Sequence, residues 1–130
     1  MQHDILHIRS VNDYAQYVGA PLLHPLVSVI HYDELSYYAR GLQLEQGLPT
    51  VSYCASQLCL SAGYFGDLIH ETTGSTAIRF IHEFVVRRAN GLLRAGGSIS
   101  STAYDLGFQN PSHFSRVYKK VTGISPSEYK

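Results

Sequence analysis

The longest regular pattern of apolar and polar residues spans roughly residues 76–95 and predicts a single long helix. Its apolar positions recur at steps of three and four residues, which places them on one helix face. They are Ile78, Ile81, Val85, Ala89 and Leu92, and Phe84 and Leu93 widen the stripe. The opposite row is polar and consists of Arg79, Glu83, Arg87, Asn90 and Arg94. At 1.5 Å per residue this helix is about 30 Å long.

Two similar segments flank this helix in the sequence. Residues 65–74 align with residues 114–123 at a constant offset of 49, and every apolar position but one matches. Upstream, residues 55–59 align with residues 103–107 at an offset of 48, so the second copy has one extra residue in its turn. Each copy reads as a short helix with a small residue, a tight turn and a second helix, which is the helix-turn-helix pattern. A plain three- or four-helix bundle is the alternative, but it does not explain two copies in register.

Residues that favour helix starts support both copies. Asn110 precedes Pro111, which pairs a capping side chain with a proline at the first helical position. In the first copy we expect Ser61 to be the cap. Either Ser98 or Ser100 can open the helix before the second turn.

The N-terminal third of the chain has a different pattern. Residues 1–35 mix β-branched and apolar residues with His and Tyr, and residues 26–30 predict one short strand. Gly41, Gly47 and Pro49 then interrupt a polar passage, which predicts a linker or a short helix with frayed ends. The tyrosines in this part can form a small core or an exposed surface that pairs chains. They are Tyr14, Tyr17, Tyr32, Tyr37 and Tyr38.

Composition limits the class of protein. The chain has 130 residues, of which 45% are hydrophobic and 15% charged, so it has the composition of a folded protein. No apolar run approaches the roughly 18 residues of a membrane span, and Met1 is not followed by a leader pattern. We therefore expect a soluble, cytoplasmic protein. Cys54 and Cys59 are too few for a disulfide framework, and we expect both to pack inside the first helix-turn-helix, with Cys59 at its turn.

Charge divides the chain into two unlike halves although the net charge is zero. Residues 1–78 carry two basic against seven acidic side chains, a net charge of −5. Residues 79–130 carry eight basic against three acidic side chains, a net charge of +5. A positive field over one half of a small protein attracts anions, nucleic acid among them. A solvated surface without a ligand is an equally good explanation of charge alone.

The second copy and the C-terminus resemble a known family. Residues 107–120 (GFQNPSHFSRVYKK) and 122–130 (TGISPSEYK) stand where the signature of the AraC/XylS transcription regulators stands. The resemblance covers residues 51–130. It implies two helix-turn-helix units, joined by a helix comparable in length to the ~34 Å turn of DNA, that enter adjacent major-groove segments on one side of a duplex. Residues 10–30 resemble only the opening of the β-rich effector domain of many members.

We therefore expect an all-α fold of two helix-turn-helix subdomains joined by a long central helix. A short strand-like or partly disordered N-terminal segment precedes it. Residues 1–46 are expected to form an N-terminal remnant and linker, and residues 47–130 the double helix-turn-helix DNA-binding domain. The resemblance implies double-stranded DNA and RNA polymerase as partners. The N-terminal segment is a candidate for pairing two chains.

The second helix of the second copy carries the best candidates for DNA contacts. Phe114, Val117 and Tyr118 form its expected packing face, which leaves the other side for a groove. Candidates for base contacts there are Ser112, Ser115 and Arg116, and Arg116 can bond guanine through two parallel hydrogen bonds. Candidates for phosphate contacts are His113, Lys119 and Lys120. The alternative is a solvated helix face.

The first copy departs from this pattern. Its matching face presents Gly63, Gly66 and Asp67 as candidates for base contacts, and Asp67 aligns with Arg116 of the second copy. An acidic side chain is repelled by phosphate, although it can accept a hydrogen bond from cytosine N4. We therefore expect the second copy to supply most of the affinity. Tyr64 is expected either to reach a phosphate or to be buried against the turn.

Other chemistry finds little support in the sequence. The N-terminal histidines are scattered, so we predict no metal site and no cofactor; they are His3, His7, His24 and His31. No nucleophile elbow or phosphate-binding glycine loop is present, and we expect no enzyme. The alternative to a DNA-binding regulator is a truncated relative that no longer binds DNA. It would act as an interaction module through its N-terminal segment.

Overall fold

The structure, a computed structural model, describes residues 34–130, and every regular element in this range is a helix, as predicted. Residues 34–39 are helical and lead into α3 (Gln43–Gln46). The remaining elements are α4 (Val51–Gln57), α5 (Ala62–Thr73), α6 (Ala77–Arg94), α7 (Ile99–Leu106), α8 (Pro111–Thr122) and α9 (Pro126–Tyr129). The strand predicted at residues 26–30 lies outside the described residues. Among the helices of residues 34–130, none combines the length and apolar character that crossing a membrane requires.

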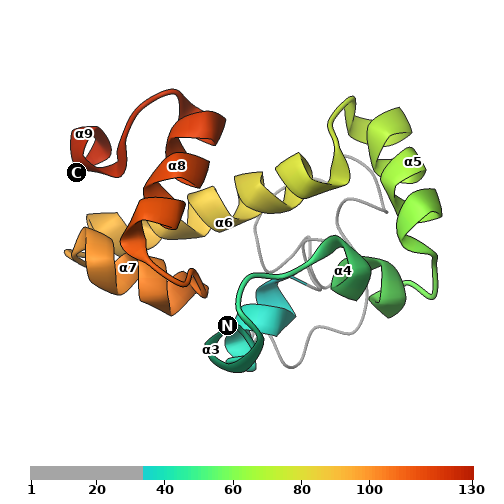
Figure 1. The fold of residues 1–130 in the computed structure, drawn as a ribbon, viewed down its shortest axis with the longest axis horizontal. Helices are drawn as coiled ribbons and strands as arrows, with labels where there is room; N and C mark the ends of the chain where they lie inside the picture. The colour runs from blue at the N-terminus through green and yellow to red at the C-terminus, as the bar shows by residue number, and fades with distance from the viewer. Residues whose placement is uncertain (1–33) are drawn as a thin grey trace, which may run out of the picture.

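The central helix α6 joins two helix pairs, α4 with α5 at one end and α7 with α8 at the other (Figure 1). Thr76 caps its start by accepting a hydrogen bond from the Arg79 N–H at 3.2 Å, and Ala95 caps its end. These limits agree with the helix predicted at residues 76–95. The arrangement of two helix-turn-helix subdomains on one long helix is therefore confirmed.

The buried face of α6 is broader than the predicted stripe. Ile81, Val85 and Ala89 are buried as expected. Ile78 is 47% exposed, so its place in the buried stripe was predicted wrongly, whereas Phe80 is buried without having been assigned to it. The reason is that α4, α5, α7 and α8 all pack on α6, so burial follows these neighbours rather than one continuous line.

The two copies of the repeat begin and end alike. Ser61 and Asn110 cap α5 and α8 through their side chains, as predicted, and both helices have 12 residues. Gly74 and Gly123 end them in left-handed conformations with φ of 76° and 84°. In both, the glycine N–H donates a 2.8 Å hydrogen bond to the carbonyl four residues earlier. Ser98, rather than Ser100, caps α7.

The turns of the two copies both contain a residue with positive φ, but their surroundings differ. Cys59 and Gly107 both have positive φ, 58° and 101°, at equivalent positions. A Cβ on Gly107 would lie 2.7 Å from the carbonyl carbon of Gly47, because residues 47–48 pass directly over this turn. Cys59 instead is exposed, so the expectation that it packs inside was wrong, whereas Cys54 is buried as predicted.

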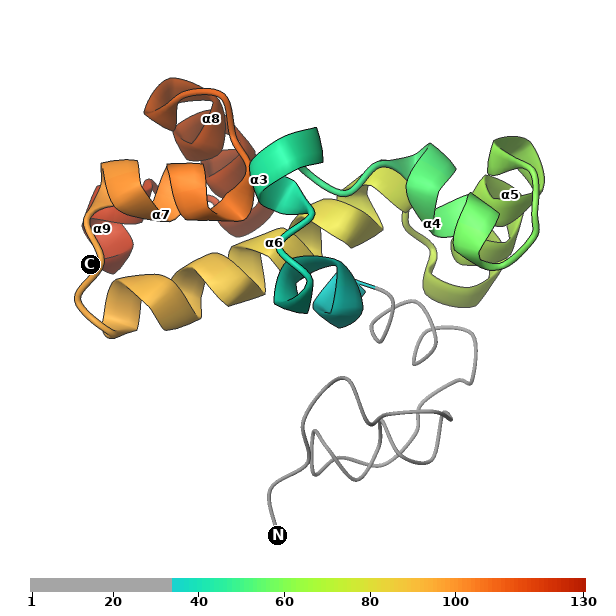
Figure 2. The same ribbon diagram turned by 90° about the horizontal axis from the view of Figure 1, so that it is seen from below.

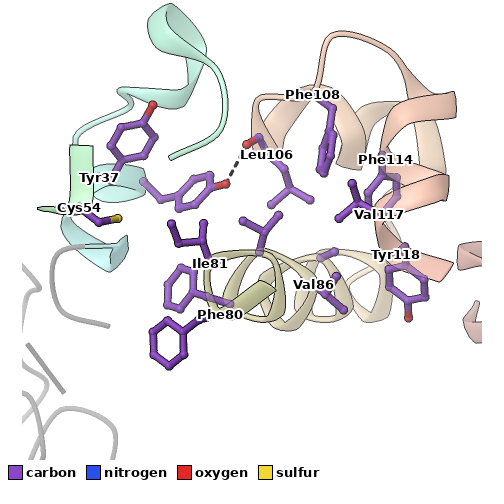
Figure 3. Close-up of a cluster of buried hydrophobic side chains, with 14 of the residues drawn as sticks. Tyr37, Cys54, Phe80, Ile81, Val86, Leu106, Phe108, Phe114, Val117 and Tyr118 are labelled. Atoms are coloured by element: carbon purple, nitrogen blue, oxygen red, sulfur yellow. Dashed lines mark hydrogen bonds between the residues drawn. The ribbon is translucent and has the colours of Figure 1, made fainter. Parts of the chain in front are cut away.

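Residues before position 47 contribute to the same core. Tyr37 and Tyr38 are 1% and 4% exposed, and Figure 3 shows Tyr37 beside Cys54. The Tyr37 hydroxyl donates to the Gly47 carbonyl at 2.7 Å. Figure 2 shows α3 beside α7. Of the two roles foreseen for the tyrosines, these two take the buried one, while Tyr14, Tyr17 and Tyr32 lie outside the described residues. The domain boundary at residue 47 stays a prediction, although the packed core extends N-terminal of it.

Candidate nucleic-acid interface

Helix α8 is held on the domain by one apolar face. Phe114, Val117 and Tyr118 are buried on it, as the sequence predicted (Figure 3). The Tyr118 hydroxyl donates a 2.6 Å hydrogen bond to Oδ1 of Asn90, which ties α8 to α6. The ring of Phe108, at the turn before α8, lies 5.3 Å from that of Phe114. The orientation of α8 is therefore fixed along its length.

The candidates for base contacts lie on the other side of α8. Ser112 and Arg116 are exposed and Ser115 is half-buried. None of the three is buried in the interior, which is the condition that base contact requires of them. The contacts themselves stay a prediction.

The candidates for phosphate contacts surround this face. Lys119 and Lys120 are exposed in the last turn of α8, and His113 is half-buried in the first turn. The His113 N–H donates to the Asn110 side chain at 2.8 Å, and the His113 ring stands edge-on to Phe108 at 5.1 Å. The His113 ring is therefore held in place, whereas both lysines are free to follow a phosphate.

Helix α5 presents a different surface. Phe65 and Ile69 are buried and hold the helix on the domain. The candidates Gly63, Tyr64 and Asp67 are exposed and Gly66 is half-buried. Tyr64 is 54% exposed, so the alternative that it is buried against the turn is wrong. Its contact with phosphate stays a prediction.

The exposed charges of α5 and α8 have opposite sign. Where α8 carries Arg116 and Lys120, the equivalent positions of α5 carry Asp67 and Glu71, and all four side chains are exposed. Figure 1 shows α5 next to the start of α6 and α8 alongside the later part of α6. The 18 residues of α6 span about 27 Å at 1.5 Å per residue. The two recognition helices thus carry exposed charges of opposite sign.

A matching family model, described as a helix-turn-helix domain, covers residues 54–130. The chain belongs to the AraC-type helix-turn-helix family. It is 32% identical over 102 residues to the uncharacterized transcriptional regulatory protein YesN of Bacillus subtilis, covering 74% of this chain and 28% of that protein. It is 30% identical over 81 residues to the arabinose operon regulatory protein of Escherichia coli, covering 62% of this chain and 28% of that protein.

Solved structures of AraC-type domains have the same fold. A DNA-binding transcriptional dual regulator from Escherichia coli superposes with a TM-score of 0.66 at 22% identity, covering 85% of this chain and 94% of that one. The C-terminal domain of AraT, a response regulator from Geobacillus stearothermophilus, superposes with a TM-score of 0.63 at 23% identity, covering 84% and 86%. The chain spans less than a third of the two curated relatives named above.

The structure of this AraC-type domain also contains a groove that the sequence did not predict. It has a volume of about 580 Å³ and lies between α6 and α8. Its lining residues are Thr76, Ile78, Arg79, His82, His113, Arg116, Val117, Lys120 and Val121. The sequence placed Arg79 in a polar row and gave His82 no role, because only the packing of α8 on α6 brings both beside the candidates for DNA contacts.

The packing of α8 on α6 also determines which charged side chains of the groove interact. Arg79 Nε lies 3.1 Å from Glu83 Oε1, and its Nη2 donates to the Val121 carbonyl at 3.5 Å. Burial lowers the pKa of His82, and the nearby His113 and Lys120 lower it further. Positive charge is therefore already concentrated here, and a further proton on His82 is disfavoured unless an anion enters.

Metal ligands do not gather in the part of the molecule that is described. Within residues 34–130 no three His, Cys, Asp or Glu side chains are placed to hold an ion. His3, His7, His24 and His31 lie outside this range.

Proposed function

We propose that this chain is the DNA-binding part of a sequence-specific transcription regulator. The observation that carries the proposal is the split of α8 into two faces. One face is buried on the domain through Phe114, Val117 and Tyr118, and the other presents Ser112 and Arg116 to solvent. A helix held in this way can enter a major groove with its polar side chains toward the base edges. The names of the relatives, one a transcriptional regulatory protein and the other an operon regulatory protein, support the same role.

The two helix-turn-helix units are proposed to contribute differently to DNA binding. In α8, Arg116 is proposed to bond O6 and N7 of a guanine, and Ser112 and Ser115 to contact neighbouring base edges. His113, Lys119 and Lys120 are proposed to contact phosphates, which contribute affinity without sequence information. Because the second unit carries the cations, it supplies most of the affinity.

In α5, the proposed base contacts are Gly63, Gly66 and Asp67, with Tyr64 on a phosphate. Asp67 and Glu71 lower the attraction of α5 for DNA in general. Asp67 can still favour a site with cytosine, because its carboxylate accepts a hydrogen bond from the cytosine N4 amino group. The first unit therefore contributes discrimination more than affinity.

The remaining parts of the proposal concern the whole regulator. RNA polymerase is its proposed protein partner, the cytoplasm its place of action, and the N-terminal segment the surface through which two chains pair. The proposal includes no catalytic role and no cofactor.

Fluorescence anisotropy of the full chain with a labelled random duplex, titrated across a salt series, tests the proposal. The logarithm of the binding constant should fall linearly with the logarithm of salt concentration, with a slope of several counterions. Selection of tight-binding duplexes from the random pool should then enrich one sequence motif. A weak, flat response to salt would favour the interaction module that acts through the N-terminal segment.

A further inference from the structure

The groove between α6 and α8 extends the cationic surface from α8 onto the central helix. Five of its nine lining residues carry or can carry positive charge, and none is acidic. They are Arg79 and His82 of α6 and His113, Arg116 and Lys120 of α8. Three of these already belong to the proposed DNA contacts, whereas Arg79 and His82 have no assigned role.

We propose that this groove binds a backbone phosphate of DNA, with Arg79 and His82 of the central helix as its ligands together with Lys120. This inference rests on the proposed function and adds α6 to the two recognition helices as a third DNA-contacting element. The start of α6 lies between α5 and α8 (Figure 1), so the phosphate it meets belongs to the backbone between the two major-groove segments.

The chemistry of the lining matches a phosphodiester more closely than a free carboxylate or a metal. Arginine and histidine N–H groups donate to phosphate oxygens. Ile78, 47% exposed, and the half-buried Val121 supply apolar surface for the deoxyribose beside the phosphate.

Arg79 is available for such a contact although it is paired with Glu83. The two side chains are 44% and 36% exposed, and an exposed pair of this kind contributes little to stability. Glu83 therefore positions the guanidinium near the Val121 carbonyl at the edge of the groove without preventing it from turning to a phosphate.

Proton uptake is a second expected property of the site. The charged groups around His82 are Arg79 and Glu83 of α6 and His113, Arg116 and Lys120 of α8. A bound phosphate adds negative charge to this mainly positive surrounding, so it favours the protonated imidazole. Binding should therefore strengthen as pH falls toward the range where His82 protonates.

The test compares the full-length chain with Arg79→Ala and His82→Gln in duplex binding. Arg94→Ala is the matched control, because Arg94 is an exposed arginine at the far end of the same helix. Arg79→Ala should weaken binding by about threefold and lower the salt slope by about 1, equally for all sequences. His82→Gln should reduce the pH dependence of binding. If Arg79→Ala matches Arg94→Ala and His82→Gln leaves the pH dependence unchanged, the inference is wrong.

The His82 imidazole signal in NMR spectra reports on the site directly. Adding duplex DNA should raise the pKa of His82, and inorganic phosphate at matched phosphate concentration should not. An equal shift with inorganic phosphate, or none with DNA, would overturn the assignment to a DNA backbone. The salt slope of the wild-type chain separates the two claims: if that chain does not bind DNA, the proposed function fails, and if it binds without these effects, only this inference fails.

Discussion

The hydroxyl of Tyr38 donates a 2.8 Å hydrogen bond to the carbonyl oxygen of Leu106, the last residue of α7. The Tyr38 ring is stacked with Phe84 of α6, and the Arg88 guanidinium lies 4.7 Å from its centre. Burial raises the pKa of Tyr38, with the Arg88 charge acting in the opposite direction, so the hydroxyl keeps its proton. A residue before the expected domain boundary thus holds the turn that leads into α8.

Tyr38→Phe should therefore destabilise the domain although it removes one oxygen atom only. The buried Leu106 carbonyl loses its partner, which costs about 1–3 kcal/mol of the free energy of unfolding. Urea unfolding followed by circular dichroism measures this change. Tyr64→Phe is the control, because Tyr64 is exposed. Equal stability of the two variants would show that the Tyr38 bond does not hold the turn.

Local features of the fold could be predicted from the sequence because they depend on neighbours in the chain. Ser61 and Asn110 cap helices through backbone groups three residues on, and Gly123 ends α8 because its φ is positive. Features that depend on distant contacts were either left open between two alternatives, as for Tyr37, or not predicted at all, as for His82. Tyr37 is buried because residues 34–39 fold back onto the domain, and His82 lines a groove because α8 crosses α6. No periodicity in the sequence records either contact.

Arg116→Ala should lose about 1–3 kcal/mol of binding free energy for the selected site and relax the base preference at one position. The reason is that two parallel hydrogen bonds from one arginine to a guanine carry sequence information. Lys119→Ala is the matched control on the same exposed face, and it should weaken binding to all sequences alike. Titrations against a panel of single-base variants of the site separate the two. An Arg116→Ala protein with unchanged affinity and preference would contradict the proposed role of α8.

Asp67→Arg should tighten binding to random DNA and steepen its salt dependence, because a repelled carboxylate is replaced by a cation that releases a counterion. The change should also abolish any preference for cytosine at the base that α5 meets. Glu45→Arg, an equal change of charge on exposed α3, is the control. If both variants tighten binding equally, general electrostatics explains the effect and α5 does not approach the DNA.

Gly107→Ala should destabilise the second helix-turn-helix more than Gly74→Ala destabilises the first. Both glycines have positive φ, which costs an L-residue about 1–2 kcal/mol. At Gly107 the new Cβ would also lie 2.7 Å from the Gly47 carbonyl carbon, whereas nothing lies within 4 Å of a Cβ on Gly74. Urea unfolding of both variants measures the difference. Equal losses of stability in the two variants would mean that residues 47–48 can move away from the new Cβ at no cost in stability.

His82 should make the free domain less stable in acid. Burial, and after it the nearby His113 and Lys120, lower its folded-state pKa below the ordinary histidine value of 6.5. Between these two pKa values the unfolded chain binds more protons than the folded one, so stability is fully present above pH 6.5 and declines as pH falls below it. His82→Gln removes this contribution. Thermal unfolding across this pH range should therefore show a smaller loss of Tm for the variant. Because other titrating groups are the same in both proteins, parallel curves would show that His82 does not resist protonation in the folded domain.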